Sequence, residues 1–240
     1  MSYRPDHVSG FKALSGQPGS SFLENKTEED IRNLFLEILY GGIHGLCFSL
    51  YEDGQKPGDV ISEGQIRRRM AILKPYTLWV RSFSCIEGNE FIPVAAREQG
   101  MNTLVGAWLG KDAEKNRQEI ANLITLAKNG YVDVAAVGNE VLYRKDLTKE
   151  ELLGFIRQVK EAVPGVPVGY VDAYYEFTEN PGIADACDVI LCNCYPFWEG
   201  TPFENSLEHL EQMYRQASRA ANGKRVIITE TGWPSKGEHT

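Results

Sequence analysis

The sequence predicts an α/β protein of the (β/α)8-barrel (TIM-barrel) type, with seven strands visible in 240 residues. Short apolar runs alternate with amphipathic helices, which predicts parallel strands joined by helical crossovers. The apolar runs are nearly continuous, as in a sheet that is buried on both faces. Nearly every run ends in a polar or aromatic residue, and in a barrel these ends meet at one mouth, where active sites lie.

A doubly wound open sheet fits the same alternation of strands and helices. No G-x-G-x-x-G or Walker pattern follows the first apolar run, which weakens the nucleotide-binding form of that fold. The pattern therefore favours the barrel and leaves the open sheet as the alternative.

The first elements are a polar tail and a leading helix. Residues 1–26 are rich in Gly, Ser and Pro, which is typical of a loop or a loosely attached tail. A helix is expected at 27–40, because Thr27 can cap it with Asp30 three residues later. Its apolar residues follow helical spacing and are Ile31, Leu34, Phe35, Ile38 and Leu39. Residues 27–240 are expected to form a single barrel domain.

The barrel strands are predicted from seven apolar runs, at 43–51, 76–83, 101–110, 132–140, 166–173, 188–196 and 225–233. Among the helices between them, the one at 148–163 begins with a capping box of Thr148 and Glu151. In the helix at 206–223, one face is expected to hold Leu207, Leu210, Tyr214, Ala217 and Ala221.

Composition and charge restrict the class of partner. The net charge of −8 argues against nucleic acid or an anionic membrane and is compatible with a neutral substrate. No run approaches the roughly 18–20 apolar residues of a membrane span, and the N-terminus carries no signal peptide. The compartment stays open, since a secreted or cell-surface protein whose signal had been removed would look the same. We expect a monomer.

Cysteine and histidine spacing predicts neither a disulfide framework nor a metal site. The five cysteines are an odd number with no small-scaffold spacing. The four histidines are scattered along the chain, and a metal site at Cys187, Cys192 and Cys194 is strongly disfavoured. We expect no metal and no cofactor.

Two predicted strands end on a glutamate, Glu140 in "AAVGNEV" and Glu230 in "IITETGW". A carboxylate at a strand end is often a solvated loop residue or a helix cap. In one barrel, however, both would reach the same mouth. Two carboxyl groups that face a bound sugar can cleave a glycosidic bond. One is protonated and donates its proton to the departing oxygen, and the other is ionised and attacks the anomeric carbon.

At these residues the sequence resembles a known family. The motifs "VGNEVL" and "ITETGWPS", with "DVILCNCYPFW", "LWVRSF" and "GLCFSLY" in the expected order, resemble glycoside hydrolase family 17 from about Ile43 to Ser235. That family contains β-1,3-glucanases and glucanosyltransferases. The resemblance implies an endo-β-1,3-glucanase that retains configuration through a covalent glycosyl-enzyme intermediate. The alternatives are a β-1,3-glucan transglycosylase and a non-catalytic β-glucan-binding barrel; a cofactor- or metal-dependent barrel enzyme is disfavoured.

The resemblance assigns Glu140 as the acid/base and Glu230 as the nucleophile, with carboxyl groups about 5–5.5 Å apart. Asn139 matches the residue that binds the sugar 2-hydroxyl. Strict strand alternation would point Asn139 and Glu140 to opposite faces. We therefore expect a bulge or bend at Gly138.

Other residues are expected to support the two carboxylates or bind the sugar. Arg81 would hold Glu230 ionised, the alternative being a structural ion pair with another carboxylate. Tyr195 shares a face with Asn193, so that Cys192 and Cys194 would point outward as small hydrophobes. Four aromatic residues are candidates for sugar contact, with core packing as the alternative: Tyr51, Trp108, Trp198 and Trp233.

The sequence departs from the family after "GWPS". The family continues with a helix and an eighth strand that closes the barrel, whereas only "SKGEHT" follows here. We therefore expect either a fragment or a barrel in which another element replaces the missing eighth βα unit.

Overall fold

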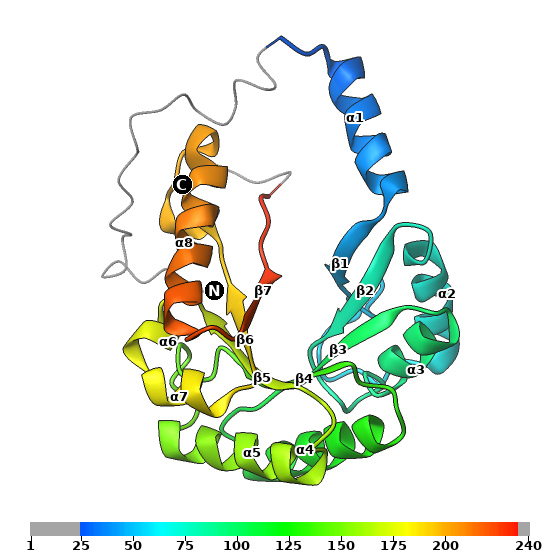
Figure 1. Cartoon of the computed structure of the whole chain (residues 1–240). Helices are drawn as coiled ribbons and strands as arrows, with labels where there is room; N and C mark the ends of the chain where they lie inside the picture. The colour runs from blue at the N-terminus through cyan, green and yellow to red at the C-terminus, as the bar shows by residue number, and fades with distance from the viewer. Residues whose placement is uncertain (1–24, 235–240) are drawn as a thin grey trace.

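Seven parallel strands form one sheet whose spatial order follows the chain. The structure is a computed structural model that describes residues 25–234. The strands are β1 (Ile43–Cys47), β2 (Thr77–Ser82), β3 (Asn102–Ala107), β4 (Val134–Asn139), β5 (Val168–Ala173), β6 (Val189–Asn193) and β7 (Arg225–Glu230). Figure 1 shows the strands arranged around a common centre as a nearly closed barrel. The predicted barrel is confirmed, because a doubly wound sheet reverses its strand order and this one does not.

Helices cover the outer face of the barrel between consecutive strands (Figure 1). They are α2 (Glu63–Leu73), α3 (Phe91–Glu98), α4 (Ala113–Lys128), α5 (Lys149–Ala162), α6 (Glu176–Glu179), α7 (Pro181–Ala186) and α8 (Ser206–Ala220), while α1 (Glu28–Gly41) precedes the first strand. Two short 3-10 helices, η3 (Pro196–Glu199) and η4 (Phe203–Asn205), follow β6. The predicted capping box of α5, in which Thr148 and Glu151 bond reciprocally, is confirmed.

The buried residues form an inner core and an outer core. The inner core fills the barrel lumen with Leu104, Val134, Ala136, Val171, Val189 and Leu191. The outer core lies between the strands and helices, and it contains Cys192 and Cys194. The predicted outward direction of these two cysteines is therefore confirmed.

Strands β1 and β7 are the two edges of the described sheet, and we call the gap between them the seam. A cavity of about 1470 Å³ opens there, lined by residues of both edges, by inner-core residues such as Leu104 and Val189, and by Glu230. At the carboxyl ends of the strands the two edges approach each other, because the Cys47 thiol donates to the Thr229 carbonyl oxygen over 3.3 Å. The seam is thus bridged at the mouth of the barrel.

Helix α1 forms as predicted but covers no core. Thr27 and Asp30 make the expected capping box, and the helix ends before Gly42. None of its residues is buried, and in Figure 1 it projects away from the barrel. Phe35 is 60% exposed, so the apolar face that the spacing predicts has no partner among residues 25–234.

The face predicted for helix α8 is buried in part, since Ala217 and Ala221 are buried and Leu210 packs against the outer core. Leu207 is 65% exposed and Tyr214 is also exposed. The buried residues are His209, Met213 and Ala217. The prediction for Leu207 and Tyr214 was wrong because His209, a polar residue, is buried by its hydrogen bond to the Thr201 hydroxyl.

Within residues 25–234, no helix combines the length and apolar content needed to cross a membrane. The predicted tail at 1–26 lies almost wholly outside the described residues, as do Ser235 and the five residues after it.

Candidate active site

Strand β4 ends in a bulge that brings two neighbouring side chains to the mouth of the barrel. Its pairing with β5 shifts register between Ala136 and Asn139. Gly138 has a φ of 87° and Glu140 a φ of 51°, both in the left-handed region. A Cβ on Gly138 would lie 2.8 Å from Val141 Cγ2, so the position favours glycine on both steric and conformational grounds. The predicted break in the strand is confirmed.

Arg81, at the end of β2, links the ends of β4 and β7. One guanidinium nitrogen lies 2.6 Å from Glu230 Oε1, and the other donates to Asn139 Oδ1 over 2.6 Å. All three side chains are buried. A planar guanidinium can hold two acceptors in a fixed relation, and its charge favours the ionised carboxylate. The predicted pairing of Arg81 with Glu230 is confirmed.

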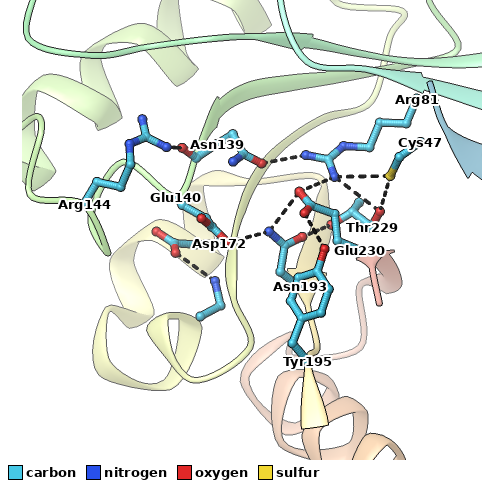
Figure 2. A network of polar contacts seen from close by, with 11 residues as sticks. Cys47, Arg81, Asn139, Glu140, Arg144, Asp172, Asn193, Tyr195, Thr229 and Glu230 are labelled. Atoms are coloured by element: carbon cyan, nitrogen blue, oxygen red, sulfur yellow. Dashed lines mark hydrogen bonds and ion pairs between the residues drawn. The ribbon is translucent and has the colours of Figure 1, made fainter. Parts of the chain in front are cut away.

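Asn193, the last residue of β6, brings the two glutamates together, as Figure 2 shows. Its amide nitrogen donates to Glu140 Oε1 over 2.9 Å and to Glu230 Oε1 over 3.1 Å. The Thr229 hydroxyl donates to the amide oxygen of Asn193 over 2.9 Å, which fixes which end of the amide faces the carboxylates.

Tyr195 holds the second oxygen of Glu230. Its phenol donates to Glu230 Oε2 over 2.8 Å. Burial, and then the charge of Glu230, raise the pKa of Tyr195 well above its ordinary value, so the phenol keeps its proton and remains a donor. Both oxygens of Glu230 therefore accept hydrogen bonds, which fixes the orientation of its carboxyl group.

The surroundings of Glu140 favour its protonated form. Burial raises the pKa of Glu140 above its ordinary value, and the charge of Glu230 raises it further. The hydrogen bond from Asn193 and the charges of Arg144 and Arg81 oppose this shift without cancelling it. The site thus pairs a carboxyl group that tends to stay protonated with a carboxylate held by three donors.

Aromatic side chains lie on the loops at the mouth. The ring of Trp233 packs at 5.2 Å from Phe197 and 5.3 Å from Phe203, and the ring of Trp198 packs at 5.2 Å from Phe197. Trp198 and Trp233 are 45% and 38% exposed, so each keeps a ring surface free for a ligand. Trp108, 42% exposed, lies under the guanidinium of Arg144 at 4.6 Å.

Tyr51 is not part of the polar network around the glutamates. It is half-buried against a separate cluster of apolar residues that includes Phe48, Leu50 and Ile61. The structure therefore brings it to a neighbouring loop rather than to the carboxylates, and its predicted contact with substrate stays a prediction.

Four residues of the polar network were not predicted from the sequence as part of the site, namely Arg144, Asp172, Thr229 and Cys47. Arg144 donates to the backbone oxygens of Asn139 and Leu109, and so joins the loops after β3 and β4. Arg144 follows Glu140 by four residues, and residues at this spacing are neighbours on a helical turn, so the sequence does contain a signal for it. Nothing in the sequence marks Thr229 or Cys47, because their contacts cross between strands far apart in the chain.

No group of three or more potential metal ligands occurs within residues 25–234. All five cysteines are free, four of them buried.

Comparisons with known proteins show which family the chain is similar to. The model of the BtgE/BtgC glycoside hydrolase domain matches residues 45–240. A glucan 1,3-β-glucosidase of Arthroderma benhamiae is 29% identical over 75% of this chain and 63% of its own length. A probable glucan endo-1,3-β-glucosidase of Emericella nidulans is 31% identical over 66% of this chain and 40% of its own. The chain thus spans less than two thirds of either relative.

Two solved structures of a β-1,3-glucanosyltransferase from Rhizomucor miehei share the fold. One, described as a glycoside hydrolase family 17 enzyme, has a TM-score of 0.71 and 31% identity over 83% of this chain and 73% of that one. The other, an active-site mutant with laminaritriose, has a TM-score of 0.73 and 30% identity, covering 84% and 75%. The matching family model and the identity to this enzyme over most of both chains show that the chain belongs to glycoside hydrolase family 17.

Proposed function

We propose that this protein hydrolyses β-1,3-glucan by a retaining double displacement, with Glu140 as acid/base and Glu230 as nucleophile. The amide nitrogen of Asn193 carries the proposal, because it lies 2.9 Å from one glutamate and 3.1 Å from the other. Two carboxyl oxygens that both bond to one nitrogen at these distances lie closer together than the roughly 6.5–9.5 Å by which an inverting enzyme separates its carboxyl groups to admit a water molecule. They suit the roughly 5–5.5 Å of a retaining pair.

In the first step, a Glu230 oxygen attacks the anomeric carbon while the bond from that carbon to the leaving oxygen breaks. The proton of Glu140 moves to the departing oxygen. In the second step, Glu140 takes a proton from water, the water oxygen attacks the anomeric carbon, and the bond to Glu230 breaks. Arg81 and Tyr195 hold Glu230 in the orientation for attack, and the raised pKa of Glu140 keeps its proton available.

Three features support β-1,3-glucan as the substrate. The named activities of the relatives concern this polymer, and one related structure holds laminaritriose. Exposed rings of Trp198, Trp233 and Trp108 offer flat apolar surfaces for pyranose faces. Asn139, fixed by Arg81, has an amide nitrogen available for the sugar 2-hydroxyl, a contact that strengthens in the transition state.

Chain transfer is the second candidate, favoured by the likeness to a named glucanosyltransferase. It shares the first step and differs only in the acceptor, since a sugar hydroxyl replaces water. Acceptor contacts and water access decide between the two outcomes.

Incubation with laminaripentaose, followed by mass analysis of products over time, tests the proposal. Hydrolysis predicts only products shorter than five sugars. Products longer than the substrate would replace hydrolysis with transfer, and binding without any product would indicate a non-catalytic glucan-binding barrel. Proton NMR of the first product formed should show the β-anomer, and the α-anomer would overturn the retaining assignment.

A further inference from the structure

The turn that follows Glu140 begins with backbone N–H groups that its own geometry cannot satisfy. The Arg144 N–H bonds to the Glu140 carbonyl over 2.8 Å, which closes one helical turn. The first N–H groups of such a turn have no partner inside it. Here two side chains of β5 accept them: Leu142 N–H donates to the Tyr170 hydroxyl over 2.9 Å, and Tyr143 N–H donates to Asp172 Oδ2 over 3.3 Å.

The two acceptors are buried and joined to each other. Tyr170 and Asp172 both have 0% exposure, and the Tyr170 hydroxyl donates to Asp172 Oδ2. Asp172 Oδ1 accepts from Ala173 N–H over 2.8 Å. The Tyr170 hydroxyl is therefore used as both donor and acceptor, and its orientation is fixed from two sides.

Asp172 lies close to Glu140 in Figure 2 and the two groups influence each other. Burial raises the pKa of Asp172 to about 8, the charge of Glu176 and then that of Glu140 adding to the effect. Asp172 and Tyr170 bond to the turn rather than to the reacting carboxyl groups, so their hydrogen bonds act on Glu140 through the backbone of residues 140–143.

The backbone at Glu140 needs such external support. Its φ of 51° is a conformation that a non-glycine residue holds only when surrounding contacts over-determine it. On one side Glu140 N–H donates to the Val171 carbonyl over 2.8 Å, and on the other the turn is held by Tyr170 and Asp172. All three contacts come from β5.

We propose that Tyr170 and Asp172 are positioning residues for Glu140, because together they cap the turn that aims its carboxyl group at the departing glycosidic oxygen. The inference rests on the proposed function, in which Glu140 donates that proton. A misplacement of about 1 Å at a catalytic group can cost about a hundredfold in rate.

The test compares leaving groups. Tyr170→Phe removes the hydroxyl and keeps the ring, which packs edge-on against Phe177 at 6.2 Å. Asp172→Ala removes the second acceptor. Thr103→Val is the matched control, because it deletes a buried hydroxyl that donates to the Tyr131 carbonyl at the opposite end of the barrel. Each variant is assayed on laminarin and on a 2,4-dinitrophenyl β-laminaribioside, whose leaving group needs no proton.

Tyr170→Phe and Asp172→Ala should lower kcat/KM on laminarin by about tenfold or more and kcat/KM on the activated glycoside by less than about twofold, because kcat/KM reports the first step, in which only laminarin needs the proton of Glu140. Thr103→Val should change both substrates equally. Amide hydrogen exchange should show lost protection at Leu142 in Tyr170→Phe and at Tyr143 in Asp172→Ala, because each variant removes the acceptor of that amide, and unchanged protection at both amides in Thr103→Val. If Asp172→Ala does not fold, Tyr170→Phe alone carries the test.

Equal losses of kcat/KM on both substrates, or unchanged protection at Leu142 in Tyr170→Phe, would overturn the positioning role while leaving the proposed function intact. A wild-type protein that cleaves neither substrate is a different failure, because it removes the proposed function and this inference with it.

Discussion

Arg81 determines the geometry of the site more than any other single residue described here. It holds the Glu230 carboxylate and the Asn139 amide from two ends of one planar group, both over 2.6 Å. Its side chain is 6% exposed, so the charge is stabilised by its partners and not by water. A buried charge of this kind makes the removal of either partner costly.

Two replacements of Arg81 should therefore separate the effect of its positive charge from the effect of its planar guanidinium shape. Arg81→Lys keeps the charge but lacks the planar fork, and kcat/KM on laminarin should fall by about a hundredfold or more. Arg81→Met leaves the buried Glu230 carboxylate unpaired and should also lower the free energy of unfolding by about 3–5 kcal/mol. Steady-state kinetics and urea unfolding measure the two effects. Near-normal activity in Arg81→Lys would contradict the role given to the guanidinium.

The dependence of activity on pH should reflect the titration of Glu140. Its pKa is raised above the ordinary value by burial, and it must be protonated to donate. Activity should therefore persist above the ordinary pKa of a glutamate and fall as pH rises through the raised pKa. Glu140→Gln should lose this alkaline limb and slow cleavage of laminarin far more than cleavage of an activated aryl glycoside. A limb unchanged in the variant would assign it to another group.

At the scale of the element, the bulge at the end of β4 makes the site possible. Without it, Asn139 and Glu140 would point to opposite faces of the strand. The bulge rests on Gly138, whose φ is 87° and whose surroundings leave no room for a Cβ beside Val141.

Gly138→Ala should therefore lower the free energy of unfolding by more than the backbone strain of a positive φ alone explains. Gly130 provides the control, because its φ is 79° while an added Cβ would meet no atom within 4 Å. Gly130→Ala should cost about 1–2 kcal/mol of unfolding free energy from backbone strain. Gly138→Ala should cost about 1–3 kcal/mol more from overpacking, and should reduce activity sharply. Similar losses of stability and full activity in both variants would contradict the importance of the bulge.

Sequence patterns predicted the seven strands, the capped helices and the two glutamates, because these depend on local spacing and on motifs. The bulge was predictable from the conflict between alternation and the motif at Asn139 and Glu140. The exposed Leu207 on α8 and the contacts of Thr229 and Asp172 were not, because they depend on which residues the closed sheet places side by side. Tyr51 illustrates the same limit, since its loop packs on its own apolar cluster.

For the molecule as a whole, the seam between β1 and β7 defines how the barrel is held. Contacts at the mouth cross it, from Cys47 to Thr229 and from Arg81 to Glu230, and the large cavity along the seam extends to these same residues. Catalytic geometry and closure of the barrel therefore depend on the same few bonds. The expected monomer stays a prediction, which sedimentation velocity can test.

Stability of the whole molecule should depend on the pH through Glu119 of α4. This buried carboxylate accepts from Cys85 N–H over 2.6 Å and from the Ser84 hydroxyl. Burial raises the pKa of Glu119 to about 7, against about 4.3 in the unfolded chain. Because the folded state then binds the proton more tightly, its contribution to stability is present at low pH and is lost as pH rises from about 4 to about 7.

Glu119→Gln should remove this dependence. The unfolding free energy of the wild type, minus that of the variant, should fall by about 3–4 kcal/mol between pH 4 and pH 8. Glu37→Gln, an exposed change on α1, should leave the pH dependence as in the wild type. Urea unfolding across this range measures both, and a difference that does not vary with pH would contradict the assignment.

The central claim is that Glu230 is the nucleophile, and azide rescue tests it most directly. Glu230→Ala should be inactive on laminarin and on an activated β-laminaribioside. Added azide should restore turnover of the activated substrate and give the α-glycosyl azide, because a small anion enters where the carboxylate was. Full activity of Glu230→Ala without azide, or a rescued product with β-configuration, would contradict the account.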